Sequence, residues 1–142
     1  MGKSFEKSEA VALIIDDTEV IRALLSEALT DKGYHAHTAA DAREGIKAAL
    51  QLHPDIIFCD TYMPDLDGIT TIRQIRKALP EAVIVLTNSL PSEEISAQAG
   101  KRDFDYLLNK PFGLEELWKI LEKVDARPLN AARDSKHKSS RR

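Results

Sequence analysis

Apolar residues occur along this chain in two alternating arrangements, which predict five strands and five helices. Five short runs are predicted to be strands, residues 11–15, 34–38, 55–60, 82–89 and 105–110. Those at 11–15, 55–60 and 82–89 are dense in aliphatic and β-branched residues, as buried strands are. After each run, apolar residues recur at intervals of three or four, which is typical of one face of a helix. These helical segments are residues 16–33, 41–53, 68–80, 92–103 and 113–124.

The first helical segment illustrates the signals that set these boundaries. Thr18 comes before the periodic stretch as a candidate N-cap, and Gly33 follows it as a glycine would at the end of a helix. The apolar positions at helical spacing are Val20, Ile21, Leu24, Leu25, Ala28 and Leu29. We expect these six side chains to face the core.

The regular alternation predicts an α/β fold, a doubly wound five-stranded parallel sheet with helices on both faces. In such a sheet, binding sites lie beyond the carboxyl ends of the strands, where the strand order reverses. Four of the predicted strands carry polar residues at or directly after their carboxyl ends, namely Asp16 and Asp17, Asp60, Thr87, and Lys110, which precedes Pro111. The sequence therefore predicts three carboxylates, a hydroxyl and an ammonium close together.

Composition is that of an ordinary globular protein, with an unusual charge distribution at its end. Of 142 residues, 43% are apolar and 30% charged, and a single cysteine, Cys59, allows no internal disulfide. From Arg127 onward there are six Lys and Arg residues and one acid, although the net charge of the chain is −3. We expect a flexible segment at 1–10, one domain at 11–125 and a basic, disordered tail or linker stub at 126–142.

The same composition bears on location and partners. No apolar run approaches the roughly 18 residues needed to span a bilayer, so no membrane segment is expected. The chain outside the tail is acidic, and the basic tail has no aromatic residues among its charges, so direct binding of nucleic acid is not expected of the domain. We expect a cytoplasmic protein.

The predicted cluster of carboxylates has a specific chemistry. Neighbouring carboxylates repel one another, and a hard divalent cation relieves that repulsion. Mg²⁺ takes oxygen ligands and favours one or two carboxylates together with phosphate oxygens. A carboxylate such as Asp60 can also act as a nucleophile and form an aspartyl-phosphate. The Lys110 ammonium and the Thr87 hydroxyl would then stabilise charge on the phosphoryl oxygens, so the set predicts Mg²⁺-dependent phosphoryl acceptance at Asp60.

Each of these residues also has an ordinary structural explanation when taken alone. An Asp-Asp pair after a strand is often a helix cap, a lysine is often a solvated charge, and Met63-Pro64 and Gly68 are turn formers. Their convergence at one edge of the sheet favours the functional interpretation. His35 and His37 have no third ligand near them in the sequence, so we expect partly exposed strand residues rather than a metal site.

The chain resembles the receiver domains of two-component response regulators over residues 11–124. Four motifs at successive strand ends carry the resemblance: Asp16-Asp17, "DTYMPDLDG" beginning at Asp60, Thr87, and "KPF" beginning at Lys110. Each motif is weak alone, and four in the right order are specific. The resemblance implies a flavodoxin-like fold with strand order 2-1-3-4-5.

The resemblance also implies roles for individual residues. Asp60 would be the phosphoacceptor, and the Mg²⁺ ligands would be Asp16, Asp17, Asp60 and the backbone carbonyl of Tyr62. Lys110 and Thr87 would contact the phosphoryl group, and Thr87 would also take part in the conformational switch. The peptide bond between Lys110 and Pro111 would be cis.

Three positions depart from the family pattern. Asn88 stands where a very small residue is usual, and could crowd the approach of water or a phosphodonor. Tyr62 is bulky and could shield the acyl-phosphate. The switch aromatic of the family usually lies three residues before the lysine, where this chain has Leu107, with Tyr106 one residue earlier. Either a one-residue bulge in the last strand restores the tyrosine, or the aromatic readout is altered.

These features predict a signalling switch that accepts a phosphoryl group on Asp60 from a histidine kinase or a histidine phosphotransfer protein. Such a protein would promote only its own phosphorylation and dephosphorylation, and would not be an enzyme toward other substrates. We expect a downstream protein to bind the face formed by residues 92–103, 105–110 and 113–124.

Other functions are compatible with part of the pattern. A phosphatase with an aspartyl-phosphate intermediate normally has a second acid two residues after the nucleophile, where this chain has Tyr62. A pseudo-receiver that binds its partners constitutively would not need the intact acidic set. The chain could also be the receiver of a longer regulator whose output domain is missing, and the sequence does not separate that case from a stand-alone regulator or a phosphate shuttle.

Overall fold

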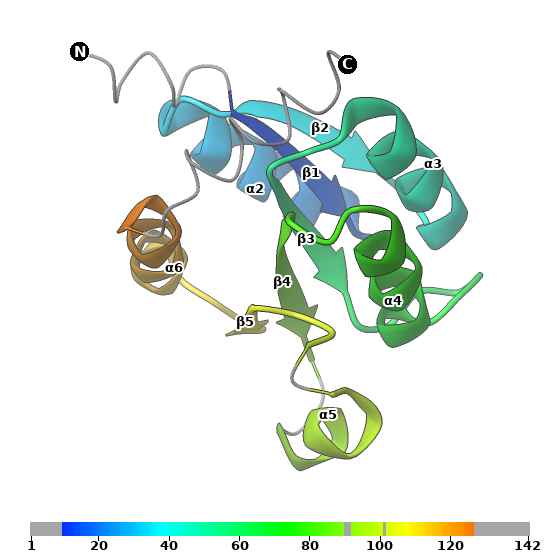
Figure 1. The fold of residues 1–142 in the computed structure, drawn as a ribbon. Coiled ribbons are helices and arrows are strands. Elements are labelled where there is room, and N and C mark those ends of the chain that lie inside the picture. Colours follow the sequence, from blue (N-terminus) through cyan, green and yellow to red (C-terminus); the bar gives the residue numbers. More distant parts are fainter. Residues whose placement is uncertain (1–9, 90–91, 101, 127–142) are drawn as a thin grey trace. The chain divides into compact units, whose positions relative to one another are not determined.

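The computed structural model describes residues 10–89, 92–100 and 102–126 of the chain (Figure 1). The chain divides into two compact units, residues 1–111 and residues 112–142, and each is described by itself. Ala10 is buried and its carbonyl accepts a hydrogen bond from the His35 amide, so the predicted flexible segment is wrong at this residue. The rest of that segment, and the tail from residue 127, lie outside the described residues.

The first unit is built on a parallel sheet of five strands in the order β2-β1-β3-β4-β5, as predicted. The three central strands consist mostly of buried apolar residues, as a sheet covered on both faces requires, whereas the two edge strands also carry polar, exposed residues. The strands are β1 (Val11–Ile15), β2 (His35–Ala39), β3 (Ile56–Asp60), β4 (Val83–Asn88) and β5 (Tyr106–Asn109). The strand order reverses between β1 and β3, which is where the sequence places its acidic residues.

Four helices connect these strands: α2 (Glu19–Asp31), α3 (Ala42–Leu52), α4 (Gly68–Ala78) and α5 (Ser92–Gln98). Helices α3 and α4 lie side by side on one face of the sheet, and α2 lies on the opposite face (Figure 1). Gly33 follows α2 with a φ of 95°, so it is the glycine expected at that helix end.

The core beneath α3, α4 and α5 is one continuous cluster of apolar side chains. Alternate residues of the central strands contribute to it, because successive side chains of a strand point to opposite faces. Its fully buried members include Leu13, Ile57, Ile84 and Leu86 from the strands and Ile72 and Ile75 from α4. Among the residues that the structure describes, no helix is both long and apolar enough to cross a membrane.

Two details of the helices differ from the sequence predictions. In α2, Leu25, Ala28 and Leu29 are buried, but Val20 is 72% exposed and Leu24 is 40% exposed. The stripe that faces the sheet is therefore narrower than the apolar stripe in the sequence. The helix predicted at 92–103 ends at Gln98, because the Asp103 carboxylate accepts a hydrogen bond from the Gly100 amide (2.7 Å) and closes a turn.

The second unit contains α6 (Leu114–Ala126). The Gly113 amide donates to Glu116 Oε1 at 2.7 Å, which satisfies one of the amides that a helix start leaves free. Two acids in the first turn and Lys123 in the last turn suit the helix dipole. The helix continues through Ala126, one residue into the segment predicted to be disordered.

Candidate functional site: an acidic cluster at the carboxyl edge of the sheet

The ends of β1, β3 and β4 bring the predicted acidic residues and the threonine to one edge of the sheet. Asp16 directly follows β1, Asp60 ends β3, and Asp60 is paired in register with Thr87 of β4. All three side chains are buried, with exposed fractions of 1%, 4% and 1%. A protein that buries carboxylates in this way needs cationic or hydrogen-bonding partners for them.

The carboxylates are close enough to share one cation. One oxygen from each of Asp16, Asp17 and Asp60 lies within 4.8 Å of the other two, and Asp17 is exposed to solvent. Among the described residues, no other group of acids, histidines or cysteines meets this criterion. Oxygen ligands of this kind suit Mg²⁺, which also keeps several waters, so an exposed ligand on one side is compatible with it.

Lys110 supplies the cationic partner within the protein. Its Nζ lies 2.9 Å from Asp16 Oδ2 and 3.4 Å from Asp60 Oδ1. Partial burial acts to lower the pKa of Lys110, but the hydrogen bond with Asp16 and the negative charges of Asp16 and Asp60 outweigh it and raise that pKa. The next peptide bond, to Pro111, is cis, as the family resemblance implied.

The surroundings of Asp60 disfavour the ionised form of its carboxyl group. Burial and then the negative charge of Asp16 raise its pKa from 3.8 to about 6, against the opposing effect of Lys110. The Tyr62 amide donates a long hydrogen bond (3.4 Å) to Asp60 Oδ1. A divalent cation beside Asp60 would favour the ionised, nucleophilic form.

Asp16 is oriented by its own strand-to-helix connection. Its Oδ1 accepts a hydrogen bond from the Thr18 amide (2.8 Å), which leaves Oδ2 for Lys110. Thr18 itself occupies the N-cap position of α2, as predicted, but its side chain makes no capping hydrogen bond. Arg22 Nη1 donates to the Asp16 carbonyl at 2.8 Å, a contact that the sequence gave no reason to expect.

The segment that follows the acceptor is tied closely to the sheet. The Thr61 amide donates to the Thr87 carbonyl (3.0 Å), and the Gly68 amide donates to the Thr61 carbonyl (2.9 Å). A Cβ on Gly68 would overlap the Asp60 carbonyl oxygen and the Thr61 backbone. Gly68 is therefore required because the start of α4 approaches the acceptor's backbone, which is more than the turn-forming role its sequence context indicates.

The ladder between β4 and β5 decides how the two switch candidates are placed. It runs without a bulge, pairing Val85 with Tyr106, Leu86 with Leu107 and Thr87 with Leu108. Leu107 is partly buried and packs against the core cluster, which includes Leu86 of β4 and Ile95 of α5. Because side chains alternate along a strand, Tyr106 lies on the opposite face of the sheet.

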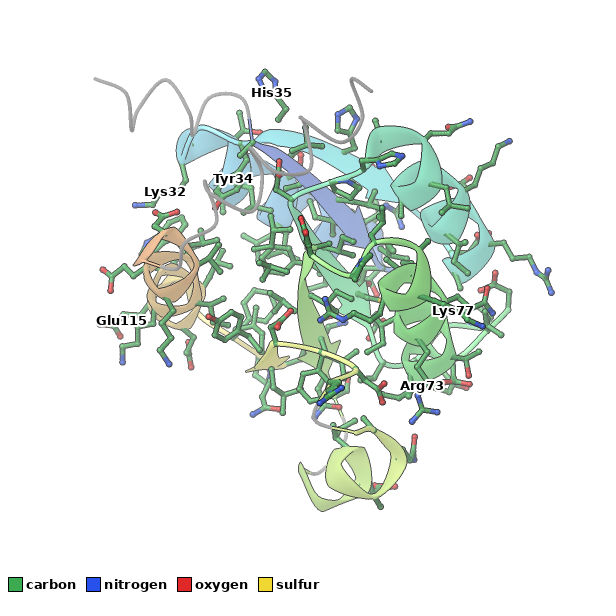
Figure 2. The ribbon with its side chains drawn as sticks, viewed as in Figure 1. Lys32, Tyr34, His35, Arg73, Lys77 and Glu115 are labelled. Atoms are coloured by element: carbon green, nitrogen blue, oxygen red, sulfur yellow. The ribbon has the colours of Figure 1, made fainter. Side chains whose placement is uncertain are left out.

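The other two departures from the family pattern also have a place in the structure. Asn88 is buried, and its Nδ2 donates to Asn109 Oδ1 at 3.1 Å, so it links the ends of β4 and β5. The Tyr62 side chain is 72% exposed, so it lies largely in solvent beside the acceptor loop. His35 and His37 are exposed on the edge strand β2, as predicted, and His35 is labelled there in Figure 2.

Comparison with known proteins identifies the protein family that the sequence motifs indicate. The model of the response regulator receiver domain family matches residues 12–122, and the chain belongs to this family. The chain is 33% identical to the chemotaxis protein CheY of Thermotoga maritima over 79% of its own length and 94% of that protein. It is 31% identical to the regulatory protein AtoC of Escherichia coli over 79% of its length, but it spans only 24% of AtoC.

Solved structures agree on the fold. The chemotaxis protein CheY4 of Vibrio cholerae superposes with a TM-score of 0.75 at 32% identity, covering 81% of this chain and 98% of that one. The response regulator TrrA of Thermotoga maritima, solved in complex with Mg²⁺-BeF, gives a TM-score of 0.73 at 28% identity, covering 81% and 98%. The flavodoxin-like fold predicted from the sequence is confirmed.

Proposed function

We propose that the chain is a phosphoacceptor switch, which receives a phosphoryl group on Asp60 from a histidine kinase or a histidine phosphotransfer protein. The observation that carries the proposal is the placement of Asp60, a buried carboxylate with Lys110 Nζ 3.4 Å away and two further carboxylates within 4.8 Å. Phosphotransfer from a protein-bound histidine needs direct contact, so the chain would work in the compartment of its donor, the cytoplasm.

The transfer can be written with this chain's residues in defined roles. One Asp60 oxygen attacks phosphorus, an acyl-phosphate O–P bond forms, and the P–N bond to the donor histidine breaks with its electron pair left on the imidazole, which takes up a proton. Lys110 is positioned to neutralise charge on a phosphoryl oxygen, and Thr87 to donate a hydrogen bond to another. Attack of water on phosphorus later restores the Asp60 carboxylate and releases inorganic phosphate.

Mg²⁺ is the cofactor that the donor set fits. Asp16, Asp17 and Asp60 would hold it with the Tyr62 carbonyl, and the bound ion would neutralise charge on the phosphoryl oxygens during transfer. The complex of TrrA with Mg²⁺-BeF is an independent reason to expect the same ligand class here, because TrrA shares the fold and 28% of its sequence.

Exposed apolar residues indicate where the donor would bind. Val20 and Tyr62 are each 72% exposed and Leu24 is 40% exposed. Val20 and Leu24 lie one helical turn apart on α2, directly after the Asp16-Asp17 pair, and Tyr62 lies two residues after the acceptor. We infer that a donor which delivers phosphoryl to Asp60 covers these three side chains.

The output would come from a different set of elements. On phosphorylation, Thr87 would move toward the new phosphoryl oxygens, which changes the packing beside β4. Leu107, on the α5 side of β5, is then the side chain proposed to move when Thr87 moves. A leucine would thus take the place of the aromatic residue that changes position in other members of the family. A downstream protein is proposed to recognise α5, β5 and α6.

A longer regulator remains the main alternative, because this chain spans 24% of AtoC and 53% of the DctR response regulator of Bacillus subtilis. In that case the same phosphoryl chemistry would control an output domain in the same polypeptide. The phosphatase alternative needs a proton donor two residues after Asp60, and the largely exposed Tyr62 offers no carboxylate there.

The decisive experiment is intact mass after incubation with Mg²⁺ and a small acyl-phosphate donor. A gain of about 80 Da that is absent in Asp60→Asn supports the switch, because it corresponds to one covalent phosphoryl group. A wild-type protein that stays unmodified by the small donor and by phosphohistidine donors would overturn the proposal. Steady turnover of phosphomonoesters, lost in the same variant, would instead establish the phosphatase.

A further inference from the structure

The loop between β3 and α4, residues 61–67, carries a carboxylate that reaches a different helix. Asp65 lies five residues after the acceptor, and its two oxygens accept hydrogen bonds from the first turn of α3. Oδ1 accepts from the Ala42 amide and Oδ2 from the Arg43 amide, each at 3.1 Å. These amides have no partner within the helix, because the first amides of any helix lack one.

The electrostatics show that this contact favours the ionised carboxylate. Desolvation acts to raise the pKa of Asp65, but the hydrogen bonds from the Arg43 and Ala42 amides outweigh it and lower that pKa. The positive end of the helix dipole acts in the same direction. At neutral pH, Asp65 therefore holds the loop to α3 with two charge-assisted hydrogen bonds.

The ends of the loop are fixed as well. Asp67 caps α4, accepting hydrogen bonds from the Thr70 amide (2.9 Å) and the Thr70 hydroxyl (2.8 Å). At the other end, the Thr61 amide is bound to the Thr87 carbonyl. Between these ends, Met63 is buried in the core cluster and Leu66 packs against it. Asp65 adds the hydrogen bonds that tie this part of the loop to α3, three residues after Tyr62, whose amide donates to Asp60 Oδ1.

Helix α3 already has a cap of its own. Asp41 occupies the N-cap position, and its Oδ1 accepts a hydrogen bond from the Glu44 amide at 2.8 Å. Glu44 Oε1 accepts a hydrogen bond (3.0 Å) from the amide of Ala40, the residue before the N-cap, which further fixes this helix start. Since α3 is capped without it, the specific effect of Asp65 falls on the loop.

We propose that Asp65 is a positioning residue for phosphoryl acceptance, which holds loop 61–67 so that the Tyr62 backbone stays in place beside Asp60. The Tyr62 carbonyl would then already be in place for Mg²⁺, so metal binding would not lose the conformational entropy of a mobile loop. This role rests on the proposed function, because it acts through the metal and the acceptor. Asp65 does not touch the reacting atoms.

Two substitutions at the same helix end test the role. Asp65→Ala and Asp41→Ala each remove a carboxylate that accepts hydrogen bonds from amides in the first turn of α3. Only Asp65 belongs to loop 61–67, which follows the acceptor. We expect Asp65→Ala to raise the Mg²⁺ dissociation constant about tenfold, as loss of a group that orients a metal ligand does. Asp41→Ala should leave it within about twofold, and Asp65→Asn, which keeps one acceptor oxygen, should be intermediate.

The measurement is a Mg²⁺ titration followed by amide chemical shifts, with the metal-free spectra compared first. Without metal, Asp65→Ala should shift the amides of residues 61–64, whereas Asp41→Ala should shift those of α3 alone. Equal Mg²⁺ dissociation constants in the two alanine variants would overturn the role of Asp65. If the wild type itself neither binds Mg²⁺ nor becomes phosphorylated, the proposed function fails, and the positioning role fails with it. Should Asp65→Ala not fold, the same comparison is made with Asp65→Asn and Asp41→Asn.

Discussion

Lys110 lies closer to Asp16 than to Asp60, with Nζ 2.9 Å from Asp16 Oδ2 and 3.4 Å from Asp60 Oδ1. The shorter contact of the ammonium is with Asp16, a proposed metal ligand that is not the phosphoacceptor. Binding of Mg²⁺ would therefore place a divalent charge next to an existing positive charge, and Lys110 would have to turn toward Asp60 as the metal takes Asp16. The lysine and the metal are coupled through the carboxylates that both would contact, Asp60 and above all Asp16.

This coupling predicts that Lys110→Ala binds Mg²⁺ more tightly than the wild type. Removing one positive charge within a few ångströms of the metal should increase affinity about tenfold, or ~1.4 kcal/mol, at the effective dielectric of a partly exposed site. Isothermal titration of the metal would measure it, with Lys77→Ala as the control, since Lys77 is exposed on α4 (Figure 2). Unchanged or weaker Mg²⁺ binding in Lys110→Ala would show that the metal does not compete with the lysine for Asp16.

The raised pKa of Asp60 predicts a dependence of stability on pH. Its folded-state pKa of about 6 lies above the ordinary value of 3.8, so the folded state binds more protons than the unfolded state between these pH values. This residue therefore makes folding less favourable as pH rises from about 4 to about 6, and the loss is complete above the folded pKa. At pH 7 without metal, Asp60→Asn should be more stable than the wild type by about 2–3 kcal/mol, because each pKa unit corresponds to ~1.4 kcal/mol.

Urea unfolding of both proteins at pH 4 and pH 7 would check this. The stability difference between Asp60→Asn and wild type should be small at pH 4 and reach its full value at pH 7. Adding Mg²⁺ at pH 7 should reduce the difference, because the cation stabilises only the carboxylate. A difference that does not change with pH would mean that Asp60 is not strained by burial and by Asp16.

Two buried threonines near the acceptor should respond in opposite directions to the same substitution. The Thr61 hydroxyl is buried and has no hydrogen-bond partner within the described part of the chain. The Thr71 hydroxyl donates to the Asp67 carbonyl at 2.8 Å. Valine has the same shape without the hydroxyl, so Thr61→Val should be neutral or stabilising by up to ~1 kcal/mol, and Thr71→Val should cost about 1 kcal/mol.

Chemical denaturation of the two variants would measure both effects with each threonine as the control for the other. A clear loss of stability in Thr61→Val would show that its hydroxyl has a partner in solution, such as an ordered water. The comparison is useful because Thr61 directly follows Asp60, where an unsatisfied group is a common feature of a functional site.

Much of the architecture follows from local sequence signals. The strand order and the convergence of Asp16, Asp60 and Thr87 could be predicted because strand periodicity, right-handed crossovers and polar strand ends all indicate the same edge of the sheet. Gly33 and the ends of most helices could be predicted because capping residues and the end of the apolar periodicity mark them locally. These features depend on a few neighbouring residues or on general rules of topology.

The features that could not be predicted depend on which side chains meet across the fold. The exposure of Val20 and Leu24 depends on how wide a stripe the sheet covers, which periodicity does not define. The contact of Asp65 with α3 joins residues 23 positions apart, and the sequence marks Asp65 only as part of a turn. The absence of a bulge in β5 likewise became clear only from its pairing with β4.

The last prediction concerns two arginines of α4 that hold the connection between α5 and β5. Arg76 donates to the Ala82 carbonyl (2.6 Å), to the Arg102 carbonyl (3.2 Å) and to Asp105 Oδ2 (2.8 Å), and its side chain is 21% exposed. Arg73 donates to the Gln98 carbonyl (2.9 Å) and to Asp103 Oδ2 (3.0 Å), with its side chain 53% exposed, and it points outward from α4 (Figure 2).

The difference in burial decides which arginine matters for stability. Arg76→Ala should cost about 2–3 kcal/mol, because it removes the charged donor of the part-buried hydrogen bond to the Ala82 carbonyl together with the bonds to the Arg102 carbonyl and Asp105. Arg73→Ala should cost less than about 1 kcal/mol, as exposed ion pairs usually do. Thermal and urea unfolding of the two variants would measure this, and equal losses would show that the Arg76 contacts do not persist in solution.

The same contacts should limit how far the phosphorylation signal spreads. Because Arg76 fixes Arg102 and Asp105, the beryllofluoride complex should shift the amides of Asn88 and α5 strongly and those of residues 102–106 weakly. In Arg76→Gln the shifts should extend into residues 102–106, since the segment is then free to follow α5, whereas Arg73→Gln should behave more like the wild type. If residues 102–106 already respond as strongly as α5 in the wild type, α4 does not restrain this segment and the output reaches β5 directly.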